Sequence, residues 1–425
     1  MKLVIYGGMV IDPANDQEAL LDVLIEDGLI RAVDKPGSFL TAGDTGIDAS
    51  GCVVAPGFVD MHVHLREPGF EYKETVLTGA RSAVAGGFTS IACMANTNPV
   101  NDNGSVTRYI IEKAQAANLA RVFPIGALSK GLKGESLADI GEMVAAGAVA
   151  ISDDGRPVMD SNLMRRALEY CAMFHLPISV HEEDLHLAAG GVMNEGPTSL
   201  RLGLKGIPNA AEDAMVARDI ILARLTGGRL HIAHTSTRGA VALVRQAKAE
   251  GLPVTAEAAP HHFSLTEEAV EGYNTNAKMA PPLRQMDDVL AIKEGLRDGT
   301  IDAIATDHAP HHRDEKEVEF DHAANGIVGL ETALPLTLRL VQDGVFSLAD
   351  AVRKLACNPA RILGLPHGTL SVGAAADIVV FAPTHSWQVA PEHLRSKSRN
   401  TPFGGWEMMG KVMTTLVGGK VVYTA

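Results

Sequence analysis

Two histidines separated by a single residue end an apolar run near residue 60. The segment FVDMHVHLREPG, residues 58–69, predicts a strand that ends in His62 and His64, with Arg66 directly behind them. Residues two apart on a strand point to the same side, so both imidazoles can face one ion. Imidazole combined with carboxylate suits Zn²⁺, with Mn²⁺, Co²⁺ or Fe²⁺ as less favoured alternatives.

Other residues with ligand chemistry also follow apolar runs. These runs are PISVH at His181, RLHIAH at His234, DAIATDH at Asp307 and His308, and AVAIS before Asp153 and Asp154. A lone HxH pattern is weak evidence, because strands carry histidines for many reasons. The HxH pattern together with histidines and aspartates at the ends of several other predicted strands favours a metal centre. The four histidines His62, His64, His181 and His234, with Asp307 and one aspartate of the 153–154 pair, exceed what one tetrahedral ion needs. We therefore predict two divalent ions bridged by a carboxylate and a hydroxide.

The elements that must position these side chains alternate regularly along residues 56–369. Eight apolar runs predict strands, at 58–64, 89–95, 121–127, 148–152, 177–181, 229–234, 253–259 and 302–308. Amphipathic helical patterns separate most of them, which indicates a parallel sheet covered by helices. We predict a (β/α)8 TIM-type barrel with its active site at the C-terminal ends of the strands. A doubly wound sheet is the alternative, but no GxGxxG follows an early strand.

Both ends of the chain carry short alternating patterns with glycine turns. KLVIYGGMVID near the start and KVMTTLVGGKVVYTA at the end predict strands. We therefore expect residues 1–55 and 370–425 to form one small β-sandwich-like domain beside the barrel.

Composition limits the classes of function. The chain has 425 residues and a formal net charge of -14, which argues against a nucleic-acid partner. Its four cysteines form no CxxC pair, which favours a reducing, cytoplasmic location. No signal peptide and no uncharged apolar stretch long enough to span a membrane are recognisable, so no membrane partner is expected.

Six segments resemble one known family. PGFVDMHVHLREPG, MANTNPV, SDDG, SVHEED, HIAHTST and ATDHAPH are similar to motifs of the amidohydrolase superfamily and, more narrowly, of class I dihydroorotases. The resemblance spans nearly the whole chain. It implies reversible cyclisation of N-carbamoyl-L-aspartate to L-dihydroorotate, in the synthesis of pyrimidine nucleotides. It also implies a metal-bridging hydroxide as nucleophile, with Asp307 as general acid and base.

The resemblance assigns roles by position. It implies a first metal held by His62, His64 and Asp307, and a second metal held by His181 and His234. Many superfamily members bridge the metals with a carboxylated lysine, but no lysine occurs between Lys133 and Lys205. The matching bridge is Asp154, with Asp153 as the alternative. The implied substrate-binding residues are His64, Arg66, Asn96, His311, Asn325 and Gly326.

One departure and two rival interpretations remain open. Family members often place a substrate-contacting asparagine where this chain has Ala280. Either Asn274 or Asn276 replaces it, or the contact is dispensable. The chain could be another cyclic amidohydrolase, such as an allantoinase or hydantoinase. It could also be a non-catalytic scaffold for aspartate transcarbamoylase, although every ligand position is filled. We further expect a homodimer, with that transcarbamoylase as a candidate partner.

Overall fold

Eight parallel strands form the centre of the computed structural model, which describes residues 2–39 and 45–425. The strands are β8 (Phe58–Val63), β9 (Phe88–Cys93), β10 (Arg121–Ala127), β11 (Ala150–Ser152), β12 (Ile178–Val180), β15 (Leu230–Ile232), β16 (Val254–Ala258) and β17 (Ala303–Ile304). A parallel bridge between Val63 and His308 links the last strand region to the first and closes the ring. All eight predicted strands are present, so the barrel prediction is confirmed.

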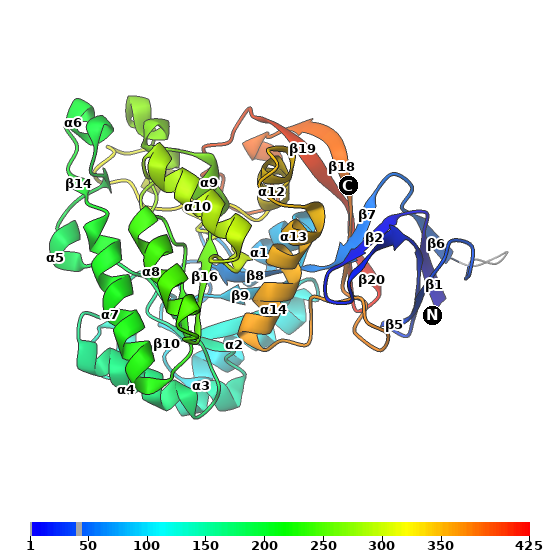
Figure 1. Ribbon diagram of the computed structural model, residues 1–425, viewed down its shortest axis with the longest axis horizontal. Coiled ribbons are helices and arrows are strands. Elements are labelled where there is room, and N and C mark those ends of the chain that lie inside the picture. The colour runs from blue at the N-terminus through cyan, green and yellow to red at the C-terminus, as the bar shows by residue number, and fades with distance from the viewer. Residues whose placement is uncertain (1, 40–44) are drawn as a thin grey trace.

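Helices cover the outside of this ring (Figure 1). Those that follow the first seven strands are α1 (Val76–Ala85), α2 (Gly104–Ala117), α3 (Ile140–Ala146), α4 (Ser161–Ala172), α7 (Ala210–Thr226), α8 (Arg238–Ala249) and α10 (Met286–Asp298). After β17 come α12 (Ala333–Gln342), α13 (Leu348–Val352) and α14 (Asn358–Leu363). Several helices begin at a side chain that caps the first turn, for example Thr75, Asn103 and Thr237.

Short helices and strands decorate the loops at the barrel mouth. They are α5 (Leu185–Ala188), β13 (Met193–Asn194), α6 (Pro197–Leu202), β14 (Gly206–Ile207), α9 (Pro260–Ser264) and α11 (Arg313–Lys316). Because these segments follow the C-terminal ends of the strands, they build the walls of the region where a barrel active site is expected.

Strands from both ends of the chain form two further sheets. One sheet has the order β5-β4-β1-β6, and the other has the order β20-β19-β18-β7-β2-β3. Their strands are β1 (Lys2–Tyr6), β2 (Met9–Asp12), β3 (Gln17–Leu20), β4 (Asp22–Glu26), β5 (Leu29–Asp34), β6 (Thr45–Asp48), β7 (Val53–Pro56), β18 (Ile378–Gln388), β19 (Glu407–Val417) and β20 (Lys420–Thr424). The antiparallel pairing of β7 with β18 joins the two ends. The exact domain boundaries at 55/56 and 369/370 stay a prediction.

Apolar and ionic contacts fix the sheets against the barrel. The ring of Phe381 on β18 lies 6.1 Å from that of Phe58 on β8, and Phe88 packs against Phe58 in turn. Arg121 on β10 donates two hydrogen bonds to Asp377, at 2.9 and 3.2 Å. These contacts anchor the base of the long β18–β19 hairpin, which then extends along α1 and α12 (Figure 1).

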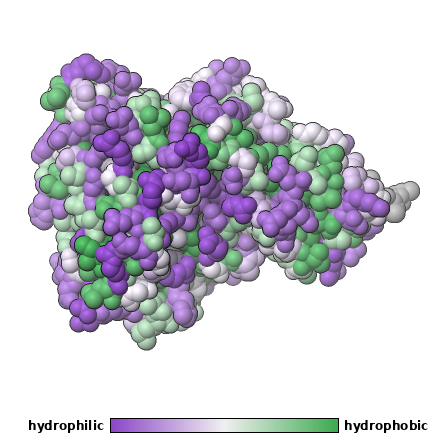
Figure 2. All heavy atoms as spheres, viewed as in Figure 1, coloured by the Kyte–Doolittle hydropathy of each residue, from purple (hydrophilic) through white to green (hydrophobic). Residues whose placement is uncertain are grey.

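The outer surface is predominantly hydrophilic on the face seen in Figure 2, with exposed hydrophobic residues in scattered patches. Within the described residues, no helix is both long enough and apolar enough to cross a membrane.

Candidate metal centre and barrel mouth

The six side chains predicted as metal ligands meet at one end of the barrel. His62 lies on β8, whereas the other five follow the C-terminal ends of β8, β11, β12, β15 and β17: His64, Asp154, His181, His234 and Asp307. All six are at least nine-tenths buried. The parallel order of the strands therefore brings together residues that are up to 245 positions apart, as the sequence predicts.

One half of the cluster contains both histidines of the HxH motif. His64 Nε2 lies 3.1 Å from Asp307 Oδ1, and His62 Nε2 lies 3.4 Å from the same oxygen. One nitrogen from each histidine and one oxygen from Asp307 lie within 4.8 Å of one another. This spacing is compatible with three ligands around a single small cation.

The other half contains His181 and His234. His181 Nδ1 lies 2.9 Å from His234 Nε2, and both nitrogens face Asp154 Oδ1, at 3.7 and 3.4 Å. Asp154 also approaches the first half, since its Oδ1 is 3.4 Å from His62 Nε2 and its Oδ2 is 3.5 Å from His64 Nε2. Asp154 therefore lies between the two halves.

The donor atoms fit a cation. His62 Nε2 faces the two aspartates but is buried without a hydrogen-bond partner among the described residues, and such an orphaned nitrogen is costly unless something binds it. Burial opposes ionisation of His62, but the carboxylates of Asp307, Glu257 and Asp154 raise its pKa well above its usual value. The carboxylates of the site therefore favour positive charge among them, and divalent ions would supply this charge in place of protons on the histidines.

Asp153 and Asp154 have different surroundings although they are adjacent. Asp153 Oδ1 accepts the backbone N–H of His181 at 3.0 Å, and its Oδ2 accepts that of Val158 at 2.8 Å. Burial raises the pKa of Asp153 to about 7, despite these hydrogen bonds. Asp153 therefore braces the loop after β11, whereas the Asp154 carboxylate faces the imidazoles.

Glu257 on β16 supports the cluster and was not predicted. Its Oε1 lies 2.6 Å from His62 Nδ1, and its Oε2 lies 3.0 Å from His231 Nε2. Burial opposes its ionisation, but the charge of His62 and the hydrogen bonds from both histidines lower its pKa to about 2. A carboxylate at Nδ1 fixes the tautomer that leaves Nε2 free for a metal. The available signal was an acid inside the apolar run PVTAEAA.

Three non-glycine residues at this end of the barrel have left-handed backbone conformations. The φ angles are +63° at Arg66, +29° at His234 and +46° at Asp307. Such conformations cost free energy for residues with a side chain and occur preferentially where function demands a particular side-chain direction. Their occurrence on three separate loops supports the assignment of this region as the functional site.

A cavity of about 270 Å³ opens above the cluster. Four predicted substrate-binding residues line it, together with His64: Arg66, Asn96, His311 and Asn325. Ala280 also lines the cavity, whereas Asn274 and Asn276 are not among its described lining residues. The departure at Ala280 is therefore not compensated by either neighbouring asparagine in this conformation.

Hydrogen bonds orient the polar groups of the cavity. Asn96 Oδ1 lies 2.9 Å from His64 Nδ1, so this amide also supports a histidine of the metal cluster. Arg66 donates from Nε to the carbonyl of Pro310 at 3.1 Å and from Nη2 to His311 Nε2 at 3.2 Å. Burial, Arg66 and the neighbouring lysines lower the pKa of His311 to about 3, so its ring is neutral at pH 7 and can accept this hydrogen bond.

Gly326 lies behind the cavity wall. Its N–H donates to the carbonyl of Lys278 at 3.0 Å, and its carbonyl accepts from Asn400 Nδ2 at 2.9 Å. A Cβ added at Gly326, where φ is +159°, would lie 2.5 Å from the carbonyl oxygen of Ala309. The structure thus brings Asn325, but not Gly326, to the cavity surface.

Asn400 connects two loops of the mouth and was also not predicted. Its Oδ1 accepts the His311 N–H at 3.0 Å, and its Nδ2 donates to the carbonyls of Ala309 and Gly326, each at 2.9 Å. Asn400 lies 89 residues beyond His311 in a segment without an alternating pattern. Its role depends on tertiary contacts that no local pattern indicates.

The parallel barrel and its histidine–aspartate cluster define the amidohydrolase class of metal-dependent enzymes. An amidohydrolase family model matches residues 280–423, and a dihydro-orotase-like model matches residues 51–240. The dihydroorotases of Geobacter metallireducens and Pelobacter propionicus are 58% and 57% identical over 423 residues, with 100% of each chain covered. The chain therefore belongs to the dihydroorotase family.

Solved structures agree on the architecture. The L-hydantoinase of Arthrobacter aurescens aligns with a TM-score of 0.89 at 27% identity, covering 99% of this chain and 96% of that one. A D-hydantoinase from Thermus sp. aligns with a TM-score of 0.85 at 25% identity, covering 99% and 94%. These neighbours share the barrel with this chain, whereas its sequence is much more similar to the dihydroorotases.

Proposed function

We propose that this chain is a cyclic amidohydrolase that interconverts N-carbamoyl-L-aspartate and L-dihydroorotate in pyrimidine synthesis. The observation that carries the proposal is the cluster of four histidines and two aspartates beneath a cavity that Arg66 lines. A cation centre next to a guanidinium matches a substrate that contains an amide carbonyl and a carboxylate. Full-length identity of 58% to a dihydroorotase supports the same reaction.

The proposed cofactor is a pair of divalent ions, with Zn²⁺ as the favoured metal. His62, His64 and Asp307 would hold one ion, His181 and His234 the other, and Asp154 would contact both. When bound, such ions supply Lewis acidity that polarises an amide carbonyl and makes water a stronger nucleophile at neutral pH. The imidazole and carboxylate donors support zinc in preference to harder ions, which prefer oxygen donors.

Arg66 and its neighbours would orient the substrate. The guanidinium edge that remains after bonding to Pro310 and His311 can pair with a substrate carboxylate through two N–H groups. Asn96 and Asn325 would offer amide groups to the remaining polar atoms of the substrate. Gly326 and Asn400 would act indirectly, by holding the loop that carries Asn325.

Asp307 would move the proton. In the hydrolytic direction, water adds to the ring carbonyl carbon and Asp307 accepts its proton. The carbon–nitrogen bond then breaks, and Asp307 returns the proton to the departing ring nitrogen. In the cyclising direction the same steps run in reverse, so the carbamoyl nitrogen attacks the carboxyl carbon and water leaves. Glu257 would keep His62 in one orientation throughout.

A substrate comparison tests this proposal. The purified, zinc-loaded chain should open dihydroorotate and form it from N-carbamoyl-L-aspartate, with much lower rates on hydantoin and allantoin. Preferential activity on hydantoin would instead indicate the reaction named for the structural neighbours. Absence of activity on all three substrates in a fully metal-loaded sample would favour the scaffold alternative.

The assembly of the chain is a further part of the proposal. We expect a homodimer, and aspartate transcarbamoylase is a candidate partner. Light scattering of the chain alone measures its oligomeric state, and light scattering of a mixture with the transcarbamoylase measures complex formation. The four cysteines, Cys52, Cys93, Cys171 and Cys357, are unpaired, which supports a reducing, cytoplasmic environment.

A further inference from the structure

A second cavity lies between the barrel and the long β18–β19 hairpin. Its volume is about 300 Å³, and it shares no lining residue with the cavity at the barrel mouth. Residues of α1, α12 and the loop before α12 form one side, while residues of β18, β19, β20 and the segment after β18 form the other. This volume is at the lower end of the range of small-molecule sites, roughly 300–1,000 Å³.

A partly buried carboxylate, that of Glu331, forms part of this cavity. Glu331 Oε1 accepts three hydrogen bonds, from Ser82 Oγ at 2.9 Å, Arg395 N at 2.7 Å and Ser396 N at 3.2 Å. Its Oε2 has no hydrogen-bond partner among the described residues. Burial raises the pKa of Glu331 to about 7 despite its three donors. A carboxyl group fixed by one oxygen thus presents its other oxygen for a ligand donor.

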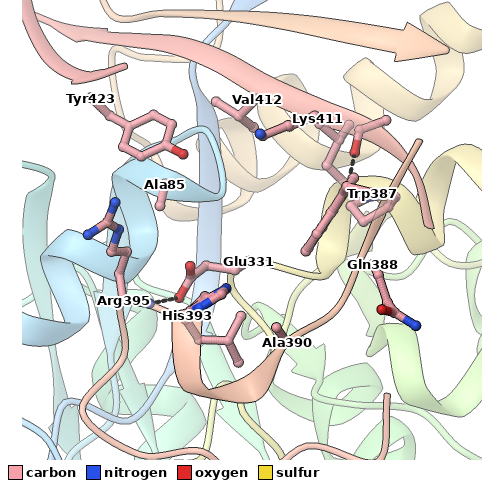
Figure 3. Close-up of a pocket in the computed structure, with 14 residues that line it drawn as sticks. Ala85, Glu331, Trp387, Gln388, Ala390, His393, Arg395, Lys411, Val412 and Tyr423 are labelled. Atoms are coloured by element: carbon pink, nitrogen blue, oxygen red, sulfur yellow. Dashed lines mark hydrogen bonds between the residues drawn. The ribbon is translucent and has the colours of Figure 1, made fainter. Parts of the chain in front are cut away.

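Aromatic rings flank the space around Glu331. Figure 3 shows Trp387 and Tyr423 on opposite sides of the cavity, with the Glu331 carboxyl group between them in this view. The Trp387 ring is fixed, because its Nε1 donates to the carbonyl of Gly410 at 2.9 Å. A fixed indole face provides a flat apolar wall against which a planar ring can stack.

Cationic side chains complete the cavity. Arg395 and Lys411 both line it, and neither side chain forms a hydrogen bond or ion pair with another described residue. The Tyr423 hydroxyl also has no hydrogen-bond partner among the described residues. Burial raises its pKa, the charge of Arg395 lowers it and that of Glu331 raises it further. Two unpaired cations in a chain of net charge -14 form a local attraction for an anion.

We propose that this cavity binds a nucleoside monophosphate. The planar base would stack on Trp387 and donate a ring or exocyclic N–H to Glu331 Oε2, while the phosphate would pair with Arg395 and Lys411. Each element of the cavity recognises one part of such a molecule: an aromatic wall for the ring, an acceptor for the N–H and two cations for a dianion. The small volume favours a pyrimidine base over a purine.

Calorimetric titration of the zinc-loaded, full-length chain with UMP tests the proposal. We expect one saturable site per chain, with uridine and inorganic phosphate each binding at least about tenfold more weakly, because each satisfies only part of the cavity. Equal binding of phosphate alone would overturn recognition of the base, and equal binding of uridine would overturn recognition of the phosphate. No UMP binding at millimolar concentration would overturn the site altogether.

Matched variants locate the bound nucleotide. Lys411→Gln and Trp387→Leu should each weaken UMP binding at least about tenfold and leave basal activity unchanged, because neither residue contacts the barrel mouth. Lys420→Gln, an exposed lysine on β20 outside the cavity, is the matched control and should bind UMP normally. If UMP binding is instead lost in His311→Ala and retained in both cavity variants, the nucleotide occupies the barrel mouth and the proposal is wrong.

Discussion

Replacing Asp153 and Asp154 one at a time distinguishes the carboxylate that binds metal from the carboxylate that supports the loop after β11. Asp153 accepts two buried backbone hydrogen bonds, from His181 and Val158. Leaving a buried donor unsatisfied costs about 1–3 kcal/mol, so Asp153→Ala should lower the free energy of unfolding by roughly 2–6 kcal/mol. No backbone N–H of the described residues donates to the Asp154 side chain, so Asp154→Ala should destabilise the metal-free chain much less.

Metal content should show the opposite pattern. Asp154 faces imidazole nitrogens of both halves of the cluster at 3.4–3.7 Å, so Asp154→Ala should reduce bound zinc from two ions per chain to one or none. Denaturant unfolding of metal-free protein and elemental analysis of zinc-loaded protein give the two readouts. Full occupancy in Asp154→Ala combined with metal loss in Asp153→Ala would reverse the two roles. Equal destabilisation by both changes would show that Asp153 does not specifically support the loop.

Four further predictions concern the residue that orients His62, the residues that bind substrate and move the proton, and the stability of the fold. Glu257→Gln should weaken metal binding about 10–100-fold, measured by competition with a chelator, whereas Glu67→Gln, a buried carboxylate outside the metal cluster, should not. Arg66→Lys should raise KM or lower kcat/KM for dihydroorotate, because a two-pronged contact to the carboxylate is lost; unchanged kinetics in both directions would remove its assigned role. Asp307→Asn should abolish nearly all turnover while at least one metal still binds, and substantial residual activity would mean that another group moves the proton. Burial opposes ionisation of Asp377, but hydrogen bonds from His367 and Arg121 lower its pKa to about 2. Its ionised form therefore stabilises the fold above about pH 4, and this stabilisation is lost as the pH falls to 2. Asp377→Asn should therefore cost roughly 2 kcal/mol at pH 7 and progressively less below pH 4, measured by urea unfolding.

Much of the fold could be predicted because the barrel repeats one simple pattern. Each apolar run bounded by an amphipathic helix is a local signal, and parallel strands place their C-terminal ends on one side. The positions of His62, His181 and Asp307 follow from that rule alone. Strand ends were less accurate: 302–308 was predicted as a strand, whereas β17 covers only Ala303–Ile304. The chain then turns through the left-handed conformation at Asp307, which no period-two pattern indicates.

The supporting residues were harder to predict because their partners are distant in sequence. Glu257 interacts with His62 across 195 residues, and Asn400 interacts with Gly326 across 74. The side of β16 that Glu257 faces depends on strand register, and Asn400 belongs to a segment after the barrel that folds back over its mouth. The choice between Asp153 and Asp154 similarly depends on side-chain direction within a turn.

Anomalous diffraction from crystals of the zinc-loaded protein locates the metal ions themselves. We predict two peaks at the zinc absorption edge, about 3.5–4 Å apart, with Asp154 between them. His62, His64 and Asp307 should surround one peak, and His181 and His234 the other. A single peak would contradict the paired centre, and peaks elsewhere with none at this cluster would contradict the metal site itself.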